Sequence, residues 1–193
     1  MAHDTSGSGY NGAVSGATWT AGKINGALKF SVNTNSVTTP NIPLGNTFSL
    51  SAWVNPTVLA QASYVRIAET YYGSGFYLGM NAAGTAYKLI MSDGYGVTGS
   101  CNGLVFGCAE GGTIASGWHL LTATYDGTTA RLYVDNALIG SDTFTAPGNT
   151  NQPLYIGHSI YGNAFNGAID EVRLYNRALT ATEVTAIYNY TGK

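Results

Sequence analysis

Charged side chains are scarce in this chain. Asp, Glu, Lys and Arg make up 9% of its 193 residues, against about 25% in an average soluble protein. The eight Lys and Arg residues are scattered and the net charge is −2, so the clustered cations that bind nucleic acid or an anionic membrane are missing. No apolar stretch approaches the ~20 residues of a membrane-spanning helix. We therefore expect neither nucleic acid nor a membrane as a partner.

Cysteine is almost absent as well. The two cysteines, Cys101 and Cys108, lie close together in a segment that is rich in glycine. Two cysteines at this spacing favour a disulfide over a metal site, with free thiols as the alternative. Because a disulfide persists outside the cytoplasm, we expect an extracellular or cell-surface location.

In place of charges the chain has 26 glycines and 14 tyrosines, together with many Ser, Thr and Asn residues. Apolar residues alternate along short segments that end in turn residues, which is typical of an antiparallel sandwich. The pattern predicts two short strands within 26–40 around a turn at 33–35, and further strands at 47–54, 64–69, 76–81, 87–91, 118–125, 128–135, 154–158 and 168–175. Residues 92–114 are predicted to form a long loop. The dipeptide Asp126-Gly127 predicts a type I′ hairpin turn.

The C-terminal segment predicts a strand that runs directly into a helix. Ala168, Val172 and Leu174 alternate onto one face, and Asp170 is predicted to share that inward face. A carboxylate among apolar residues is costly unless a cation or a hydrogen-bond donor pairs with it, so this position is a candidate metal ligand. The segment 180–183 matches a capping box and predicts a helix over 181–188.

Short motifs follow one another in a fixed order along almost the whole chain, at 4–12, 26–30, 48–54, 117–119, 123–127, 132–134, 156–157, 165–167 and 169–179. In this order they resemble the laminin-G-like branch of the concanavalin A-like lectin/glucanase superfamily. The resemblance implies an all-β fold, a two-sheet antiparallel jelly-roll sandwich with one short C-terminal helix. We expect a single domain over 1–193 that is monomeric and belongs to a larger secreted protein.

The resemblance also implies a structural calcium ion that joins the first and last strands. It places side-chain ligands on Asp4 and Asp170, and carbonyl ligands on the loop that contains Gly7, Gly9 and Gly12. Calcium takes about six to eight oxygen ligands, and a glycine-rich turn can direct several carbonyls at one point. The alternative is that Asp4 forms a local Asx turn and that Asp170 pairs with a nearby arginine or amide.

The sequence does not contain the carboxylate pattern of a glycosidase. Retaining enzymes need two carboxyl groups about 5 Å apart, whereas Asp170 and Glu171 are adjacent and would point to opposite faces of a strand. A polysaccharide lyase would need a base beside a cation. The residues that could serve such a reaction are Gln61, Arg66, Tyr77 and His158. We expect that the chain is not an enzyme.

Aromatic residues give the stronger functional signal. Sugar rings stack on Tyr or Trp, while amides and short acids bind the hydroxyl groups. The candidate ligand-binding residues are Tyr71, Tyr72, Tyr77, Tyr95 and Tyr161, with Arg66, Asp93, His158 and Asn163 as polar companions. The alternative for each tyrosine is simple packing on the outer face of a sheet.

The leading hypothesis is a non-catalytic carbohydrate-binding module that targets a secreted enzyme or surface protein to a polysaccharide or oligosaccharide. The alternative is a protein-binding adhesion or spacer domain, in which the same tyrosines form an interface. A small polysaccharide lyase or hydrolase is the third and weakest hypothesis.

Overall fold

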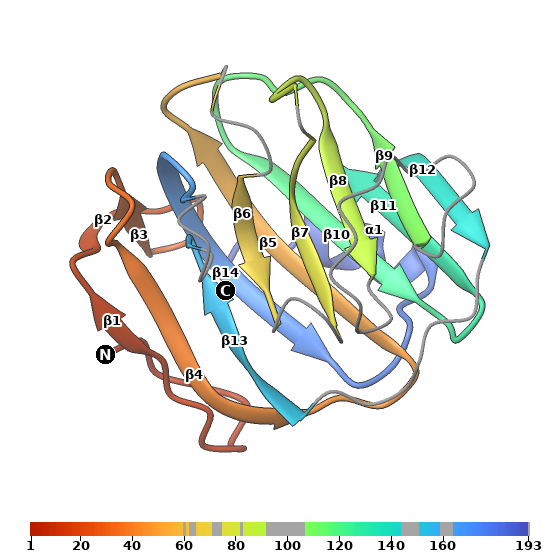
Figure 1. Ribbon diagram of the computed structural model, residues 1–193, viewed down its shortest axis with the longest axis horizontal. Helices are drawn as coiled ribbons and strands as arrows, with labels where there is room; N and C mark the ends of the chain where they lie inside the picture. The colour runs from red at the N-terminus through yellow and green to blue at the C-terminus, as the bar shows by residue number, and fades with distance from the viewer. Residues whose placement is uncertain are drawn as a thin grey trace.

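The computed structural model describes residues 1–59, 61, 65–70, 75–81, 83–91, 107–143, 151–158 and 164–192. Within these residues the chain forms two antiparallel sheets of seven strands, packed face to face, and one short helix near the C-terminus (Figure 1). The predicted all-β sandwich with a C-terminal helix is confirmed. No helix in this part of the chain is long and apolar enough to cross a membrane.

The first sheet has the strand order β1-β4-β13-β6-β7-β8-β9. Its strands are β1 (Ala13–Ser15), β4 (Ser36–Pro43), β13 (Asn151–Ile156), β6 (Arg66–Glu69), β7 (Phe76–Met80), β8 (Tyr87–Met91) and β9 (Gly107–Gly111). The second sheet has the order β12-β11-β10-β5-β14-β3-β2. Its strands are β12 (Ala137–Thr143), β11 (Thr129–Val134), β10 (His119–Tyr125), β5 (Phe48–Pro56), β14 (Gly167–Tyr175), β3 (Gly26–Phe30) and β2 (Thr18–Ala21).

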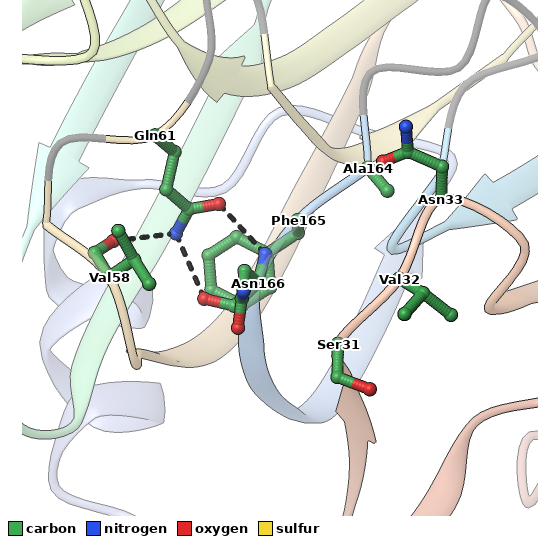
Figure 2. Close-up of a pocket in the computed structure, with 8 residues that line it drawn as sticks. All are labelled: Ser31, Val32, Asn33, Val58, Gln61, Ala164, Phe165 and Asn166. Atoms are coloured by element: carbon green, nitrogen blue, oxygen red, sulfur yellow. Dashed lines mark hydrogen bonds between the residues drawn. The ribbon is translucent and has the colours of Figure 1, made fainter.

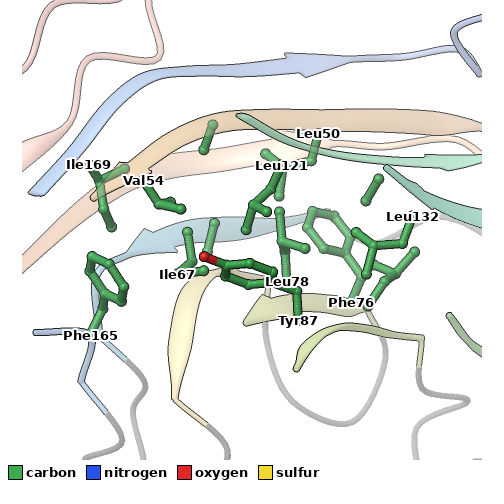
Figure 3. Packing of buried hydrophobic residues seen from close by; sticks show 14 of the residues in the cluster. Leu50, Val54, Ile67, Phe76, Leu78, Tyr87, Leu121, Leu132, Phe165 and Ile169 are labelled. Atoms are coloured by element: carbon green, nitrogen blue, oxygen red, sulfur yellow. The ribbon is translucent and has the colours of Figure 1, made fainter. Parts of the chain in front are cut away.

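The core fills the space between the two sheets. Leu50 and Leu121 of the second sheet are fully buried, as are Leu78 and Tyr87 of the first, and Figure 3 shows these side chains packed between the sheets. At one position the contact is aromatic, because the rings of Phe48 in β5 and Phe76 in β7 stack with centroids 4.5 Å apart. Burial of these alternating apolar side chains drives the two sheets together.

Helix α1 (Ala181–Tyr188) covers part of the outer face of the second sheet. Its buried residue Val184 packs with Tyr133 of β11, and Tyr188 stacks on Trp53 of β5 at 5.7 Å. The predicted capping box is confirmed. The Thr180 hydroxyl accepts a hydrogen bond from the Glu183 amide, and the Glu183 carboxylate accepts one from the Thr180 amide.

The predicted type I′ turn at Asp126-Gly127 is wrong, because only Gly127 of this pair has a positive φ, at 98°. The Asp126 carboxylate instead accepts hydrogen bonds from the amides of Thr128 and Thr129. Two consecutive positive φ angles, which a type I′ turn requires, occur at Asp135 (48°) and Asn136 (73°). This turn joins β11 to β12.

The predicted inward position of Asp170 is also wrong. Ile169 packs in the core, and so do Val172 and Leu174, so Asp170 points to the outer face of the second sheet. The cause is a β-bulge between Asp170 and Arg173, where Glu171 has a φ of 49°. A bulge adds one residue to the strand and therefore shifts the alternation of its side chains by one position.

Several strands have no clear alternation in the sequence and were not predicted. All four residues of β2 are exposed, which includes Trp19 at 61%. Strand β9 lies inside the segment 92–114 that was predicted as a loop. Its glycine-rich sequence is a poor β-former, and its hydrogen bonds come from pairing with β8.

Gly157 allows a close approach between β13 and the core. Its φ is 76°, and a Cβ atom at this position would collide with the aromatic ring of Phe30. We expect Gly157→Ala to lower the free energy of unfolding by about 2–4 kcal/mol, measured by urea denaturation. Gly45→Ala is the matched control, because a Cβ there meets nothing within 4 Å. Equal effects of the two substitutions would contradict this account.

The capping box should make the stability of the fold depend on pH. The ion pair with Arg177 and the hydrogen bonds from Thr180 lower the pKa of Glu183 from 4.5 to about 2. A carboxylate with a lowered pKa stabilises the fold above its ordinary pKa, and this contribution is lost as the pH falls toward the folded-state value. We therefore expect the wild type to melt at a higher temperature than Glu183→Gln near neutral pH. The difference should shrink as the pH falls from about 4.5 to about 2, and a difference that does not change with pH would contradict the assignment.

Candidate functional site

Three connections meet at one end of the sandwich, which we call the cleft end. Strand β13 finishes here, with Ile156 opposite Val37 of β4 and Ala68 of β6. Strand β14 begins here, with Gly167 opposite the last residues of β3 and β5. The β3–β4, β5–β6 and β13–β14 connections therefore start or finish together. The β6–β7 and β8–β9 connections leave the first sheet at the opposite end.

A cleft of about 250 Å³ lies between these three connections (Figure 2). Its lining comes from three separate parts of the chain and consists of Ser31, Val32, Asn33, Val58, Gln61, Ala164, Phe165 and Asn166. Phe165 is fully buried, whereas Val32 and Val58 are 54% and 42% exposed. The cleft thus has a rigid apolar base and an exposed aliphatic rim.

Gln61 joins two of the three walls. Its side-chain amide nitrogen donates to the carbonyl oxygens of Val58 and Asn166, each at 2.9 Å. Its side-chain oxygen accepts a hydrogen bond of 2.7 Å from the Asn166 amide. Figure 2 shows these three bonds as dashed lines across the wall. Because its donors and its acceptor are all used, Gln61 fixes the shape of the cleft.

None of the eight described lining residues has a charged side chain. The side-chain amides of Asn33 and Asn166 line the cleft, and neither forms a hydrogen bond within the described part of the chain. An asparagine amide carries two donor hydrogens and one acceptor oxygen. These two side chains can therefore bind hydroxyl groups of a ligand, while the valines contact its apolar parts.

A second polar group lies on the outer face of the first sheet. The Arg66 side chain donates to the Glu69 carboxylate at 2.9 Å, and its guanidinium lies 3.6 Å from the centre of the Tyr77 ring. The bulge between Arg66 and Ala68 brings Arg66 and Glu69 to the same face. Arg66 and Tyr77 are only 4% and 3% exposed, so both side chains are enclosed in this structure.

Polar side chains of the neighbouring strands β8 and β9 extend this group toward the edge of the first sheet. Lys88 of β8 is opposite Glu110 of β9, and their side chains form an ion pair of 3.0 Å. Asn81 donates to the same carboxylate at 2.8 Å. Burial raises the pKa of Glu110, but the hydrogen bonds from Asn81 and Lys88 outweigh it and hold the value below its usual range.

Every glutamate of the chain is held by a cation. Glu69 and Glu110 pair with Arg66 and Lys88, and the remaining pairs are Arg173–Glu171 and Arg177–Glu183. A general acid in a glycosidase needs a raised pKa, whereas the pKa values of Glu110 and Glu183 are held below their ordinary range by hydrogen bonds and by the paired cation. These two glutamates are therefore not arranged for acid catalysis.

The structure brings some of the predicted ligand-binding residues together and separates others. Arg66 and Tyr77 are in contact, and His158 follows β13 at the cleft end, where it is half-buried. The other predicted residues, Tyr71, Tyr72, Asp93, Tyr95, Tyr161 and Asn163, lie outside the described residues. The role of the predicted set in binding therefore stays a prediction.

Of the eight residues that line the cleft, only Gln61 was a candidate site residue from the sequence, as part of a hypothetical lyase. Asn33 was noted only as part of the turn at 33–35, and Phe165 and Asn166 only as part of the motif at 165–167. None of these three was assigned a role in binding, because the three segments of the lining are far apart in the chain.

The proposed disulfide stays a prediction. Cys108 lies in β9 and is not a free thiol, and its amide donates to the Asp142 carboxylate at 3.3 Å. Its expected partner, Cys101, lies outside the described residues.

The two carboxylates predicted to hold calcium lie in different parts of the sandwich. Asp4 precedes β1 at the edge of the first sheet. Its carboxylate accepts hydrogen bonds from the Ser6 amide, the Ser6 hydroxyl and the Tyr10 amide. The bond to Ser6 closes the local Asx turn that was the alternative prediction. These bonds, led by the one from the Ser6 amide, lower the pKa of Asp4.

Asp170 is 5% exposed on the outer face of the second sheet. One oxygen accepts a hydrogen bond of 2.8 Å from the Ile24 amide and the other accepts one of 2.8 Å from the Glu171 amide. Burial raises the pKa of this carboxyl despite those bonds. Each oxygen thus accepts an N–H hydrogen bond, and Asp170 shares no hydrogen-bond partner with Asp4. The calcium site on Asp4 and Asp170 stays a prediction.

The chain resembles known proteins over most of its length. The family described as "Concanavalin A-like lectin/glucanases superfamily" matches residues 31–185. Domain 4 of AbnA, a GH43 extracellular arabinanase from Geobacillus stearothermophilus solved in complex with arabinotriose, has 20% identity and a TM-score of 0.73, with 95% of this chain and 91% of that chain covered. No curated protein sequence matches the chain.

Two toxin domains have the same fold. The binding domain of Paraclostridial Mosquitocidal Protein 1 has 17% identity and a TM-score of 0.76, with 96% of this chain and 48% of that chain covered. The binding domain of botulinum neurotoxin serotype G has 17% identity and a TM-score of 0.74, with 96% and 47% covered. The chain therefore spans about half the length of these toxin domains. At such identities the similarity shows the fold alone.

The hydrogen bonds of Asp170 lead to a stability prediction. Asp170→Ala would leave the buried amides of Ile24 and Glu171 without an acceptor, and we expect it to lower the free energy of unfolding by about 1–3 kcal/mol. Asp170→Asn keeps an acceptor oxygen for Ile24 and should cost less. The measurement is urea denaturation of all three proteins, in calcium and in a chelator. We expect the same loss in both; a loss that occurs only in calcium would instead identify Asp170 as a metal ligand.

Proposed function

Because the chain belongs to the concanavalin A-like lectin/glucanase superfamily, we propose that it is a non-catalytic carbohydrate-binding domain. It would attach a secreted enzyme or surface protein to a polysaccharide. The observation that carries the proposal is the cleft at the cleft end, in which the amides of Asn33 and Asn166 lie between exposed valines.

The chemistry of this cleft suits a sugar. A sugar ring has hydroxyl groups around its edge and C–H groups on its faces. Amides bind hydroxyls as both donors and acceptors, and the aliphatic side chains of Val32 and Val58 can contact the C–H groups. A hydroxyl that leaves water needs a replacement hydrogen bond, which the two amides can supply.

The structural neighbours support a role in glycan binding. The AbnA domain was solved in complex with arabinotriose, and it is part of an extracellular arabinanase. The toxin neighbours are binding domains of larger proteins. By analogy we infer an extracellular location and attachment to other domains.

The side chains that a catalytic role would need are already occupied. The guanidinium of Arg66, which a lyase would use to neutralise a substrate carboxylate, is paired with Glu69 and covers Tyr77. The four glutamates are paired with cations. These pairings favour binding without turnover.

A protein partner is the second candidate. Val32, Val58 and Leu59 are exposed at the cleft end, at 54%, 42% and 43%, and apolar side chains with a polar rim are also typical of protein interfaces. This hypothesis would make the protein an adhesion or spacer domain.

Affinity electrophoresis against a panel of neutral and acidic polysaccharides tests the proposed function. We expect at least one polymer to retard the protein, because a preformed cleft binds its ligand without a large conformational cost. Incubation with the same polymer should release neither reducing nor unsaturated sugar ends. Sugar release would refute the non-catalytic proposal. A folded protein that no polysaccharide retards would exclude carbohydrate binding and favour the protein partner.

A further inference from the structure

We infer that the cleft binds one neutral sugar unit, and that the amides of Asn33 and Asn166 recognise its hydroxyls. This inference rests on the proposed function and names the class of ligand. It differs from the expectation that tyrosines form the main contacts, with Arg66 among their polar companions.

The described lining of the cleft carries no charge. None of these eight residues is ionisable, so they offer no counterion for the carboxylate of a uronic acid. A carboxylate moved from water into such a site would lose hydration without a compensating cation. A neutral sugar has no such cost.

The nearest arginine does not change this conclusion. Arg66 adjoins the cleft wall, because it forms a parallel bridge with Ala164. Its guanidinium, however, is paired with Glu69 and lies against the Tyr77 ring, and the residue is 4% exposed. An acidic ligand would have to displace Glu69, which would leave a buried carboxylate without its cation. The arginine therefore supports the wall and is not presented to the ligand.

Two side-chain amides of the lining are available to a ligand. Gln61 uses both its donors and its acceptor within the wall, whereas the side chains of Asn33 and Asn166 have no hydrogen-bond partner among the described residues. They come from the β3–β4 turn and from the residue before β14, on different walls. Two amides with both donor and acceptor atoms suit hydroxyl groups, which are themselves donors and acceptors.

None of the described lining residues offers an exposed aromatic ring on which a sugar could stack. Phe165 is the one aromatic residue among them, and it is fully buried, so its ring face is not offered to a ligand. Among the described lining residues, Val32 and Val58 can supply apolar contact. The volume of about 250 Å³ is below the ~300–1,000 Å³ of sites for drug-sized ligands. It suits one sugar ring of a longer chain.

The test uses the intact chain and its Asn33→Ala and Asn166→Ala variants. Arabinan, xylan and β-glucan serve as neutral probes, and polygalacturonate and alginate as acidic probes, in affinity electrophoresis at low and high salt. We expect a neutral polymer to retard the wild type equally at both salt concentrations, because salt screens only charged contacts. Each alanine variant should bind this polymer about tenfold more weakly.

Asn46→Ala is the matched control. Asn46 is an exposed asparagine before β5, at the end of the sandwich opposite to the cleft, and its substitution should leave binding unchanged. Thermal melting confirms that each variant is folded. Asn33 is exposed in a turn and Asn166 keeps its backbone hydrogen bonds, so both variants should melt like the wild type.

Three outcomes would overturn the inference. Salt-sensitive retardation by acidic polymers alone would show that the ligand is charged. Wild-type binding of a neutral polymer by both alanine variants would place the sugar elsewhere, and the proposed carbohydrate-binding function would survive. Retardation by no polymer of either class would reject the proposed function together with the inference.

Discussion

Burial of the apolar inner faces of the two sheets is the contact on which the rest of the molecule depends. The central strands place alternate side chains between the sheets, where Leu50, Leu78, Tyr87 and Leu121 are fully buried. This packing leaves the outer faces and the two ends of the sandwich for polar groups. The outer face of the second sheet is partly closed by α1 through Val184 and Tyr188. The ligand site is therefore sought at an end, where connections from distant parts of the chain meet.

Charged side chains are also buried on the outer face of the first sheet. Arg66 and Lys88 are enclosed there, and each forms an ion pair with a carboxylate, Glu69 and Glu110 respectively. Asp170 has no cation as its hydrogen-bond partner and is satisfied by two backbone amides. An unpaired buried charge would destabilise the fold by more than the pair stabilises it. These charged side chains therefore serve the structure and are not free for catalysis.

The sequence predicted the features that depend on local pattern. Alternation in Phe48–Pro56 and His119–Tyr125 identified β5 and β10, and Thr180 with Glu183 identified the start of α1. It did not predict the bulge at Glu171, because a bulge depends on how β14 pairs with β5. Strand β2 is exposed along its length and so has no pattern of burial to detect. The cleft could not be predicted for a similar reason, since Asn33, Gln61 and Asn166 become neighbours only after the sheets have formed.

The three hydrogen bonds of Gln61 have a consequence for the thermodynamics of binding. Two of them connect residues that are 105 positions apart in the chain, so the β5–β6 wall and the β13–β14 wall of the cleft are held at a fixed separation before any ligand arrives. The conformational entropy of bringing these walls together is thus lost during folding and not during association. A ligand that fits would meet a preorganised surface, and its affinity would be limited by the quality of its contacts and by its own loss of freedom.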